Sequence, residues 1–407
     1  MRALYAFHAV ALSAALSLLP AHSVSAALPF EAQFSQLQTI LKGKRVGLLT
    51  NPTAVDCQYN LLADRLHQAP EIQLVCFFAP EHGLRDDRQA GEKIEDYVDE
   101  ITGLPVYSVY GARRSPEPEH LAELDVLVCD MQDVGARFYT RIWTMSRAME
   151  ATAKAGRDFV VFDRPNPIGL ARMEGAPITF DAGLIGTLWP GQPFGIPTRH
   201  GMTVGEILTL VNEEWADPKA KLTVIKIPGY TRTMTFEDTR YPWVMPSPNM
   251  PTIDTAMVYT GTCVFEGTNL SEGRGTTRPF ELIGAPFIEG SKLARRLNAA
   301  GLKGVRFRPA WFTPTFDDHE GKRCAGVQLH VMDREAFEPV RTGLTMLKVL
   351  CDMYPDEVAV TEFASRLMGV PQLHKKIRTE SVEALIASWQ ENLKAFAVKR
   401  KPHLLYP

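Results

Sequence analysis

The chain has 407 residues, of which 45% are hydrophobic and 22% are charged, and its formal net charge is −3. This length exceeds that of a typical single-core domain, so two domains are expected. The balance is slightly acidic and contains no basic run, which argues against nucleic acid as a partner.

The first 26 residues have the pattern of a secretory signal peptide. Arg2 precedes an apolar stretch over residues 9–19, and Val24 and Ala26 supply small residues at positions −3 and −1 of a cleavage site. The apolar stretch is shorter than the ~20 residues that a membrane span needs. We therefore expect residues 1–26 to be removed, no stable membrane span to remain, and the mature protein to be exported, either periplasmic or secreted.

From about residue 28 to residue 155 the chain alternates between predicted helices and predicted strands, and a further strand follows. Helices are expected at residues 34–41, 60–68, 121–124 and 141–155, and strands at residues 45–49, 72–78, 105–110, 125–129 and 159–162. The strands are nearly continuous apolar runs, as in parallel strands buried on both faces. The alternation predicts an α/β fold with a Rossmann-like, doubly wound parallel sheet and right-handed crossovers. No G-x-G-x-x-G motif follows the first strand, so dinucleotide binding is not supported and no cofactor is expected.

The rest of the chain completes the first domain and predicts a second, smaller domain after it. Residues 164–200 are a proline-rich loop, typical of a binding loop or an inter-domain element. A helix is expected after Thr203, with Thr203 as its cap and Glu206 as the capping-box partner, and a strand is expected at residues 222–227. A proline cluster over residues 242–251 then indicates a junction. The predicted organisation is a Rossmann-like domain at residues 27–240 and a smaller α+β domain at residues 241–407, which closes the active-site cleft.

Six cysteines in an exported chain could form disulfides. Cys76 and Cys129 lie in apolar strand runs, and Cys263 lies in a similar run. No C-x-x-C spacing is present, so these residues are expected to be buried structural thiols, with a bridge between any pair left open.

Polar residues follow the predicted strands where they end. Because the carboxyl ends of parallel strands gather at one edge of a sheet, their loops form a single crevice. The side chains expected there are Glu81, His82, Asp133, Asp163, Arg164 and Asn166.

Glu81 stands in the sharpest local motif, Pro80-Glu81-His82-Gly83. Pro80 stiffens the exit from the strand and Gly83 permits a tight turn, so the carboxyl group is held rigidly. Apolar neighbours could raise its pKa by desolvation and make it a general acid. The alternative is that Glu81 and His82 cap the next helix or pair with Arg85.

Two further loops carry polar groups suited to a sugar. Residues 130–140 contain Asp133, Arg137 and Tyr139, which can bind hydroxyl groups and balance an anion; the alternative is a local Asp133–Arg137 pair. The glycine-rich residues 266–276 could complete the site from the opposite wall, although they could also be a plain turn. Its polar members are Glu266, Asn269, Glu272 and Arg274, and the proline-stiffened residues 246–251 add Asn249.

A catalytic metal is not expected, since no H-E-x-x-H motif or close histidine pair is present. His200 is interpreted as a ligand-contacting or capping residue. The serine-hydrolase motif G-x-S-x-G is also absent.

Six segments together resemble the exo-β-N-acetylmuramidase family, the NamZ-like glycoside hydrolases of peptidoglycan turnover and cell wall recycling. They are residues 48–53, 80–83, 130–140, 163–167, 246–251 and 266–276, and the match covers nearly the whole mature chain. The resemblance implies release of terminal N-acetylmuramic acid from the non-reducing end of β-1,4-linked peptidoglycan fragments, in a cleft between two domains.

The resemblance implies that Glu81 is catalytic. Glycoside hydrolysis needs a second carboxylate unless the substrate's acetamido group attacks. We assign that role to Glu272 by inference from the residues, with Glu266, Asp133 and Asp163 left open. Arg137, Arg164 and Arg274 are candidates for the cation that binds the lactyl carboxylate. The predicted substrate-binding residues are Asn51, His82, Asp133, Arg137, Tyr139, Asp163, Arg164, Asn166, His200, Asn249, Glu266, Asn269 and Arg274.

Two other classes of function remain open at this point. A non-catalytic, exported sugar-binding protein would use the same two-domain cleft. A metal-dependent hydrolase would lose activity in a chelator.

Overall fold

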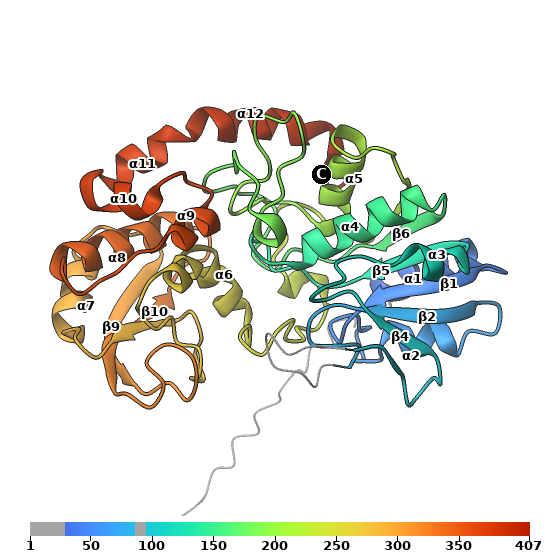
Figure 1. Cartoon of the computed structure of the whole chain (residues 1–407), viewed down its shortest axis with the longest axis horizontal. Helices are drawn as coiled ribbons and strands as arrows, with labels where there is room; N and C mark the ends of the chain where they lie inside the picture. The colour runs from blue at the N-terminus through green and yellow to red at the C-terminus, as the bar shows by residue number, and fades with distance from the viewer. Residues whose placement is uncertain (1–28, 86–94) are drawn as a thin grey trace, which may run out of the picture.

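The computed structural model describes residues 29–85 and 95–407, so the expected signal peptide lies outside the described residues. Two lobes are visible in Figure 1, joined across the centre and along the top. In the described ranges, no helix combines the length and the apolar character of a membrane span.

The first lobe is built on a seven-stranded sheet in the order β3-β4-β2-β1-β5-β6-β7. Its strands are β1 (Arg45–Thr50), β2 (Gln73–Ala79), β3 (Tyr97–Val98), β4 (Pro105–Ser108), β5 (Val126–Asp130), β6 (Asp158–Phe162) and β7 (Lys221–Ile225). The short β3 pairs antiparallel, and the other described strands of this sheet run parallel. The predicted doubly wound α/β sheet is confirmed.

Both faces of this sheet are buried. Alternate side chains of a strand point to opposite faces, so neighbouring residues of one strand join different hydrophobic clusters. In β1, Val46 and Leu48 join one hydrophobic cluster, which also contains Phe30 of α1. Leu49 joins the other cluster, which contains Trp143 of α4. The helices of this lobe are α1 (Pro29–Leu41), α2 (Leu62–His67), α3 (Pro118–Ala122), α4 (Arg141–Lys154) and α5 (Val204–Glu214), with 3-10 turns η1 (Gly183–Ile185) and η2 (Glu237–Thr239).

The second lobe is smaller and contains an antiparallel sheet in the order β8-β10-β9. Its strands are β8 (Leu282–Ala285), β9 (Val305–Phe312) and β10 (Cys324–Val331). Its helices are α6 (Ile253–Thr262), α7 (Gly290–Asn298), α8 (Pro339–Met353), α9 (Glu362–Met368), α10 (Leu373–Thr379), α11 (Val382–Ser388) and α12 (Gln390–Arg400), with 3-10 turns η3 (Cys263–Gly267) and η4 (Lys401–His403).

One local prediction is wrong in the second lobe. The apolar run around Cys263 is helical rather than strand-like, because η3 continues directly from α6 and brings Gly267 against the backbone of Ala364. All six cysteines are free, and all but Cys57 are buried.

The chain crosses between the lobes more than once. Helix α12 runs along the top of Figure 1 and carries the C-terminus back to the first lobe. There the Tyr406 hydroxyl donates to Asp163 at 2.6 Å, and the backbone N–H of Arg232 donates to the Pro407 carbonyl oxygen at 2.8 Å. In the other direction, Val134, Ala136 and Phe138 pack into the core of the second lobe. The loop of residues 130–140 therefore lies at the junction.

Candidate active site

Glu81 lies in the tight turn that follows β2. The Gly83 N–H donates to the Pro80 carbonyl oxygen at 3.1 Å, and His82 has a φ of 79°. A positive φ at the third residue is the mark of a type II turn, and it is uncommon for a residue other than glycine. Half-buried Glu81 is the second residue of this turn, and the Tyr110 hydroxyl donates to its Oε1 at 2.8 Å. The glutamate is thus held on a short, rigid turn at the carboxyl end of the sheet.

The alternative pairing of Glu81 with Arg85 is not formed. Arg85 pairs instead with Asp64 and Asp99, each through contacts of 2.7 Å.

Several buried polar atoms near Glu81 have no hydrogen-bond partner among the described residues. They are Asp133 Oδ1, the Tyr139 hydroxyl, and Nε and Nη1 of Arg141. Burial raises the pKa of Tyr139, the Arg141 cation opposes the shift, and the Asp133 and Glu81 carboxylates add to it. Because buried polar groups are nearly always paired, a cluster of unpaired ones indicates a site that a polar ligand completes.

Arg141 connects this cluster to two loops. Its Nη2 donates to the carbonyl oxygens of Glu81, at 3.2 Å, and of Pro246, at 3.1 Å. Its guanidinium carbon lies 5.9 Å from the centroid of the Tyr139 ring. The remaining two nitrogens are left for a ligand beside the Glu81 turn.

His200 orients Asp133. The Met202 N–H donates to His200 Nδ1 at 3.2 Å, which leaves Nε2 as the donor to Asp133 Oδ2, also at 3.2 Å. The Gly135 N–H donates to the same carboxylate oxygen at 2.7 Å. One oxygen of Asp133 is therefore fixed by the protein, while the other is the unpartnered Oδ1.

A second group of charges lies in the other lobe, after η3. Arg274 pairs with Glu266 through Nη2 and with Glu272 through Nε, both at 2.8 Å. Burial raises the pKa of Glu272 to about 7, and the Arg274 cation opposes this shift. Asp317 is a third carboxylate near Arg274, at 3.8 Å, so the charge of Arg274 is shared among three carboxylates.

Aromatic rings connect the two groups across the junction. Tyr139 and Tyr259 of α6 meet edge to face, with centroids 6.2 Å apart, and Tyr259 meets Phe280 in the same way at 4.6 Å. Arg274 lies over Phe280, 5.3 Å from its centroid. Figure 1 shows α6 in the part of the second lobe that faces the first lobe. These contacts therefore run from Tyr139, beside the Glu81 group, to Arg274 of the Glu272 group.

Several predicted substrate-binding residues use their side chains within the protein. These residues are Asn51, Arg137, Asp163, Arg164, Asn166 and Asn269. The three asparagines tie loops together: Asn51 accepts from the Thr53 hydroxyl at 2.6 Å, Asn166 donates to the Met202 carbonyl oxygen at 2.9 Å, and Asn269 donates to that of Glu357 at 2.8 Å.

The two arginines proposed from the first lobe are engaged by buried partners. Arg164 makes two bonds of 2.7 Å to Asp130, and its third nitrogen donates to the Val55 carbonyl oxygen. Arg137 donates from its terminal nitrogens to the carbonyl oxygens of Ile185 and Leu367, which ties the two lobes together. Neither offers a two-pronged guanidinium to a substrate carboxylate. Nor is the local Asp133–Arg137 pair formed, since both side chains have other partners.

Asp163 is fully buried and anchors the start of α5. Its carboxylate accepts from the hydroxyls of Thr203 and Tyr406 and from the Gly205 N–H at 2.6–2.8 Å. Burial raises its pKa to about 7, and these three donors oppose the shift.

Asn249 differs from the other asparagines. Its side-chain amide makes no hydrogen bond to another described residue, and it is not among the buried unpartnered groups. It follows Pro246, whose carbonyl oxygen contacts Arg141, so it remains a candidate for substrate binding.

Sequence reasoning missed Arg141 and Tyr110. From the sequence, Arg141 is only the first residue of the expected helix at residues 141–155. A cation in the first turn of a helix faces the positive end of the helix dipole, and that unfavourable placement is the signal that could have identified it. No group of three or more His, Cys, Asp or Glu side chains suited to a metal ion occurs within the described residues.

Comparisons with known proteins show the family to which the chain belongs. The family model described as "Exo-beta-N-acetylmuramidase NamZ, N-terminal" matches residues 46–254, and the corresponding C-terminal model matches residues 257–406. The chain is 48% identical over 369 residues to the peptidoglycan beta-N-acetylmuramidase NamZ of Bacillus subtilis strain 168, covering 90% of this chain and 88% of that protein.

Two crystal structures of DUF1343 family proteins from Bacteroides fragilis NCTC 9343 have the same fold. One has a TM-score of 0.84 and 33% identity over 93% of this chain and 98% of the other. The second has a TM-score of 0.72 and 30% identity over 92% and 97% of the two chains. The two family models divide the chain near the start of α6, whereas the boundary expected from the proline cluster, at residues 240–241, stays a prediction. The chain belongs to the exo-β-N-acetylmuramidase NamZ family.

Proposed function

We propose that this protein is an exo-acting glycoside hydrolase that releases terminal N-acetylmuramic acid from the non-reducing end of β-1,4-linked peptidoglycan fragments. The observation that carries this proposal is the rigid Glu81 turn beside a cluster of unpartnered buried polar atoms, in a chain of the NamZ family. A relative that is 48% identical over 369 residues is a peptidoglycan beta-N-acetylmuramidase.

In this proposal, Glu81 protonates the glycosidic oxygen of the leaving sugar. The Tyr110 hydroxyl donates to its Oε1 and so orients the carboxyl group. General acid catalysis by a positioned carboxyl contributes about 10²- to 10⁴-fold to the rate.

Asp133 is the carboxylate that the described contacts favour as the partner of Glu81. His200 and the Gly135 N–H fix one of its oxygens, and the other is buried without a partner close to Tyr139. Glu272, the partner expected from the sequence, is paired with Arg274 in the opposite wall. The assignment to Glu272 stays a prediction, and parallel variants of both residues decide between them.

Arg141 is the cation that fits the lactyl carboxylate of the substrate. Its Nε and Nη1 have no hydrogen-bond partner among the described residues, and each can donate one charge-assisted hydrogen bond to a carboxylate oxygen. Arg137 and Arg164 hold other partners, and Arg274 already binds two carboxylates.

The test is hydrolysis of a chromogenic β-N-acetylmuraminide by the purified mature protein, together with Glu81→Gln and a sample treated with chelator. We expect release by the wild type that persists in chelator and falls at least 10²-fold in Glu81→Gln. Activity lost in chelator would point to a metal-dependent hydrolase. Tight binding of a muramic-acid-terminated disaccharide with no release from either substrate would point to a binding protein.

We also propose that the mature protein is exported, because residues 1–26 have the pattern of a cleaved signal peptide. Edman sequencing of the protein from its native host tests this. A mature chain that begins near Ala27 supports export, and an intact N-terminus in a cytoplasmic fraction contradicts it.

A further inference from the structure

A groove leads away from the Glu81 turn along α4. Its near end is a narrow pocket of about 20 Å³ whose lining includes Glu81, Tyr110 and Arg114. Its far end is a wider pocket of about 400 Å³ whose lining includes Arg114, Arg147 and Lys154. Arg114 lines both pockets, so they are consecutive parts of one groove.

The walls of the groove also run continuously between the two pockets. One wall is α4, from which Arg141 and Thr144 line the near pocket and Arg147, Ala151 and Lys154 line the far pocket. These positions are three or four residues apart, so they form a single stripe along one face of the helix. The other wall is the segment after β4, which supplies residues 109–111 to the near pocket and Ser115, Pro116, Pro118 and Leu121 to the far one.

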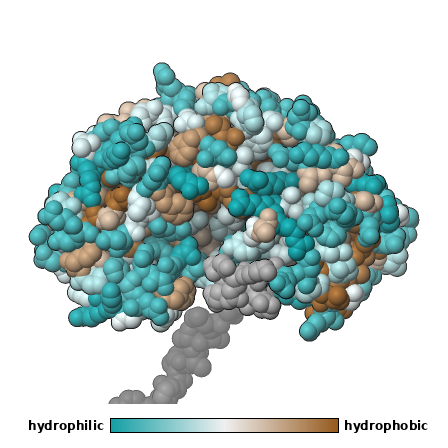
Figure 2. All heavy atoms as spheres, viewed as in Figure 1, coloured by the Kyte–Doolittle hydropathy of each residue, from teal (hydrophilic) through white to brown (hydrophobic). Residues whose placement is uncertain are grey.

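The far pocket carries an excess of positive charge. Arg147 has an Nε that is buried without a hydrogen-bond partner, and Arg114 and Lys154 are exposed. Glu150 is the carboxylate among the residues that line it, and its Oε1 accepts from the indole N–H of Trp189 at 3.0 Å. Figure 2 shows a largely hydrophilic surface over this part of the first lobe.

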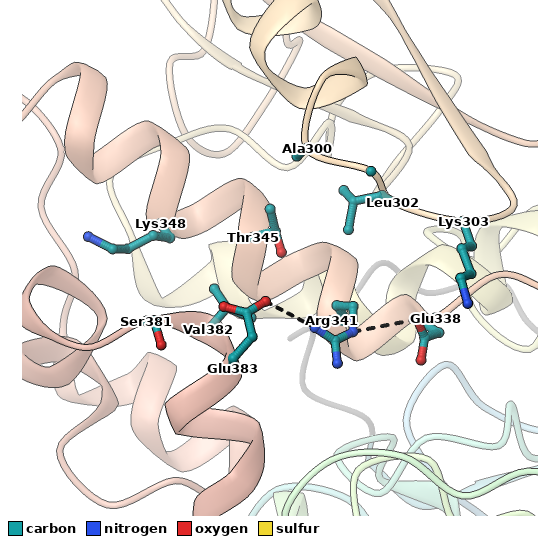
Figure 3. A pocket seen from close by; sticks show the side chains of 11 residues that line it. Ala300, Leu302, Lys303, Glu338, Arg341, Thr345, Lys348, Ser381, Val382 and Glu383 are labelled. Atoms are coloured by element: carbon teal, nitrogen blue, oxygen red, sulfur yellow. Dashed lines mark hydrogen bonds and ion pairs between the residues drawn. The ribbon is translucent and has the colours of Figure 1, made fainter.

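A larger pocket in the second lobe lacks this excess of available cations. It has a volume of about 590 Å³ and lies between α8, the start of α11 and the turn before β9 (Figure 3). There Arg341 pairs with Glu338 at 3.4 Å and with Glu383 at 3.2 Å. A substitution of a lysine in this pocket therefore serves as a control for substitutions of the cations in the α4 groove.

We propose that the α4 groove binds the second carboxylate-bearing sugar of a longer glycan, two units beyond the terminal residue that is released. This inference rests on the proposed function. In an alternating chain the leaving sugar, N-acetylglucosamine, is uncharged, and the next muramoyl residue carries a lactyl carboxylate. Arg147 and Lys154 are seven residues apart, roughly 10 Å along the helix at ~1.5 Å per residue, so these cations continue along α4 beyond the pocket that contains Glu81.

The groove therefore sets a preference for chain length. A disaccharide substrate ends at the leaving sugar and does not reach Arg147, whereas a tetrasaccharide places an anion beside it. Charge-assisted hydrogen bonds are stronger than neutral ones, and this contact is gained only by longer chains.

The experiment measures KM and kcat for a muramic-acid-terminated disaccharide and for the alternating tetrasaccharide. The wild type is expected to show a lower KM for the tetrasaccharide. Arg147→Gln and Lys154→Gln should each raise that KM about three- to tenfold and leave kcat and the disaccharide KM unchanged. A tetrasaccharide whose inner lactyl carboxyl is amidated should bind the wild type as weakly as the natural tetrasaccharide binds Arg147→Gln.

Lys303→Gln, in the pocket of Figure 3, is the matched control and should behave as the wild type on every substrate. An unchanged tetrasaccharide KM in both α4 variants would overturn the inference, as would equal losses on both substrates. If the wild type hydrolyses neither glycan, the proposed function fails by itself. Calorimetric binding of the two tetrasaccharides then tests the groove separately, with the amidated form expected to bind more weakly.

Discussion

Replacing Arg141 by lysine is expected to reduce recognition of the lactyl carboxylate. The guanidinium is positioned by the carbonyl oxygens of Glu81 and Pro246, and its Nε and Nη1 are buried without partners. Lysine keeps the positive charge but lacks the planar guanidinium, whose donors are held in fixed directions by these two carbonyl oxygens. A hydrogen bond to a charged group contributes about 1.5–3 kcal/mol, so losing one should lower kcat/KM roughly 10- to 100-fold.

The assay compares a chromogenic β-N-acetylmuraminide with its lactyl amide, which has the same leaving group and no negative charge. The wild type should prefer the acid, and Arg141→Lys should lose most of that preference. Arg137→Lys is the control, because Arg137 donates to two carbonyl oxygens between the lobes and should change the melting temperature without changing the preference. If Arg141→Lys lowers kcat/KM equally for both substrates, our assignment of the lactyl site is wrong.

Two further predictions concern buried carboxyl groups. If Asp133 is the second catalytic carboxylate, Asp133→Asn should lower kcat about 10²- to 10⁴-fold, and added azide should restore turnover. If azide instead restores turnover of Glu272→Gln and not of Asp133→Asn, the second catalytic carboxylate is Glu272. The folded-state pKa of Asp163 is raised from 3.8 to about 7, so the fold favours its protonated form. Its stabilising contribution is complete below pH ~4 and is lost as the pH rises through 7. Urea unfolding at pH 4, 5.5 and 8 should show a smaller loss of stability with rising pH in Asp163→Asn than in the wild type, and identical profiles would contradict this.

The sheet could be predicted from the sequence because its signal is local. Each apolar run of the first half became a strand within one or two residues of the expected bounds, and α5 begins at Thr203 as its capping box indicates. A parallel strand buried on both faces needs no information from elsewhere in the chain to be recognised.

The roles of the polar side chains depend on distant partners and could not be predicted in the same way. Asp163 and Arg164 follow a strand and precede a proline, which favours display at the surface. The structure buries both, because Asp130 comes from a neighbouring strand and Tyr406 arrives from the far end of the chain. Only the fold reveals which polar residues are satisfied internally, and therefore which ones, such as Asp133, are left for a ligand.

The return of the C-terminus to the first lobe leads to a last prediction, about Arg400. This buried residue donates from Nη1 to the carbonyl oxygens of His200, at 2.9 Å, and Gly201, at 2.7 Å. It therefore fixes the segment from which His200 contacts Asp133. Arg400→Gln should leave two buried carbonyl oxygens poorly satisfied and loosen that contact.

We expect Arg400→Gln to lower kcat about tenfold with little change in KM, because the residue lies outside the substrate site and acts through the orientation of His200. Lys399→Gln is the matched control, since Lys399 makes a more exposed ion pair with Glu214 at 3.0 Å. The discriminating measurement is the pH profile of kcat, which should change in shape in Arg400→Gln if the His200–Asp133 contact is affected. A lower melting temperature with unchanged kcat and an unchanged profile would show that the C-terminal segment stabilises the fold without orienting the site.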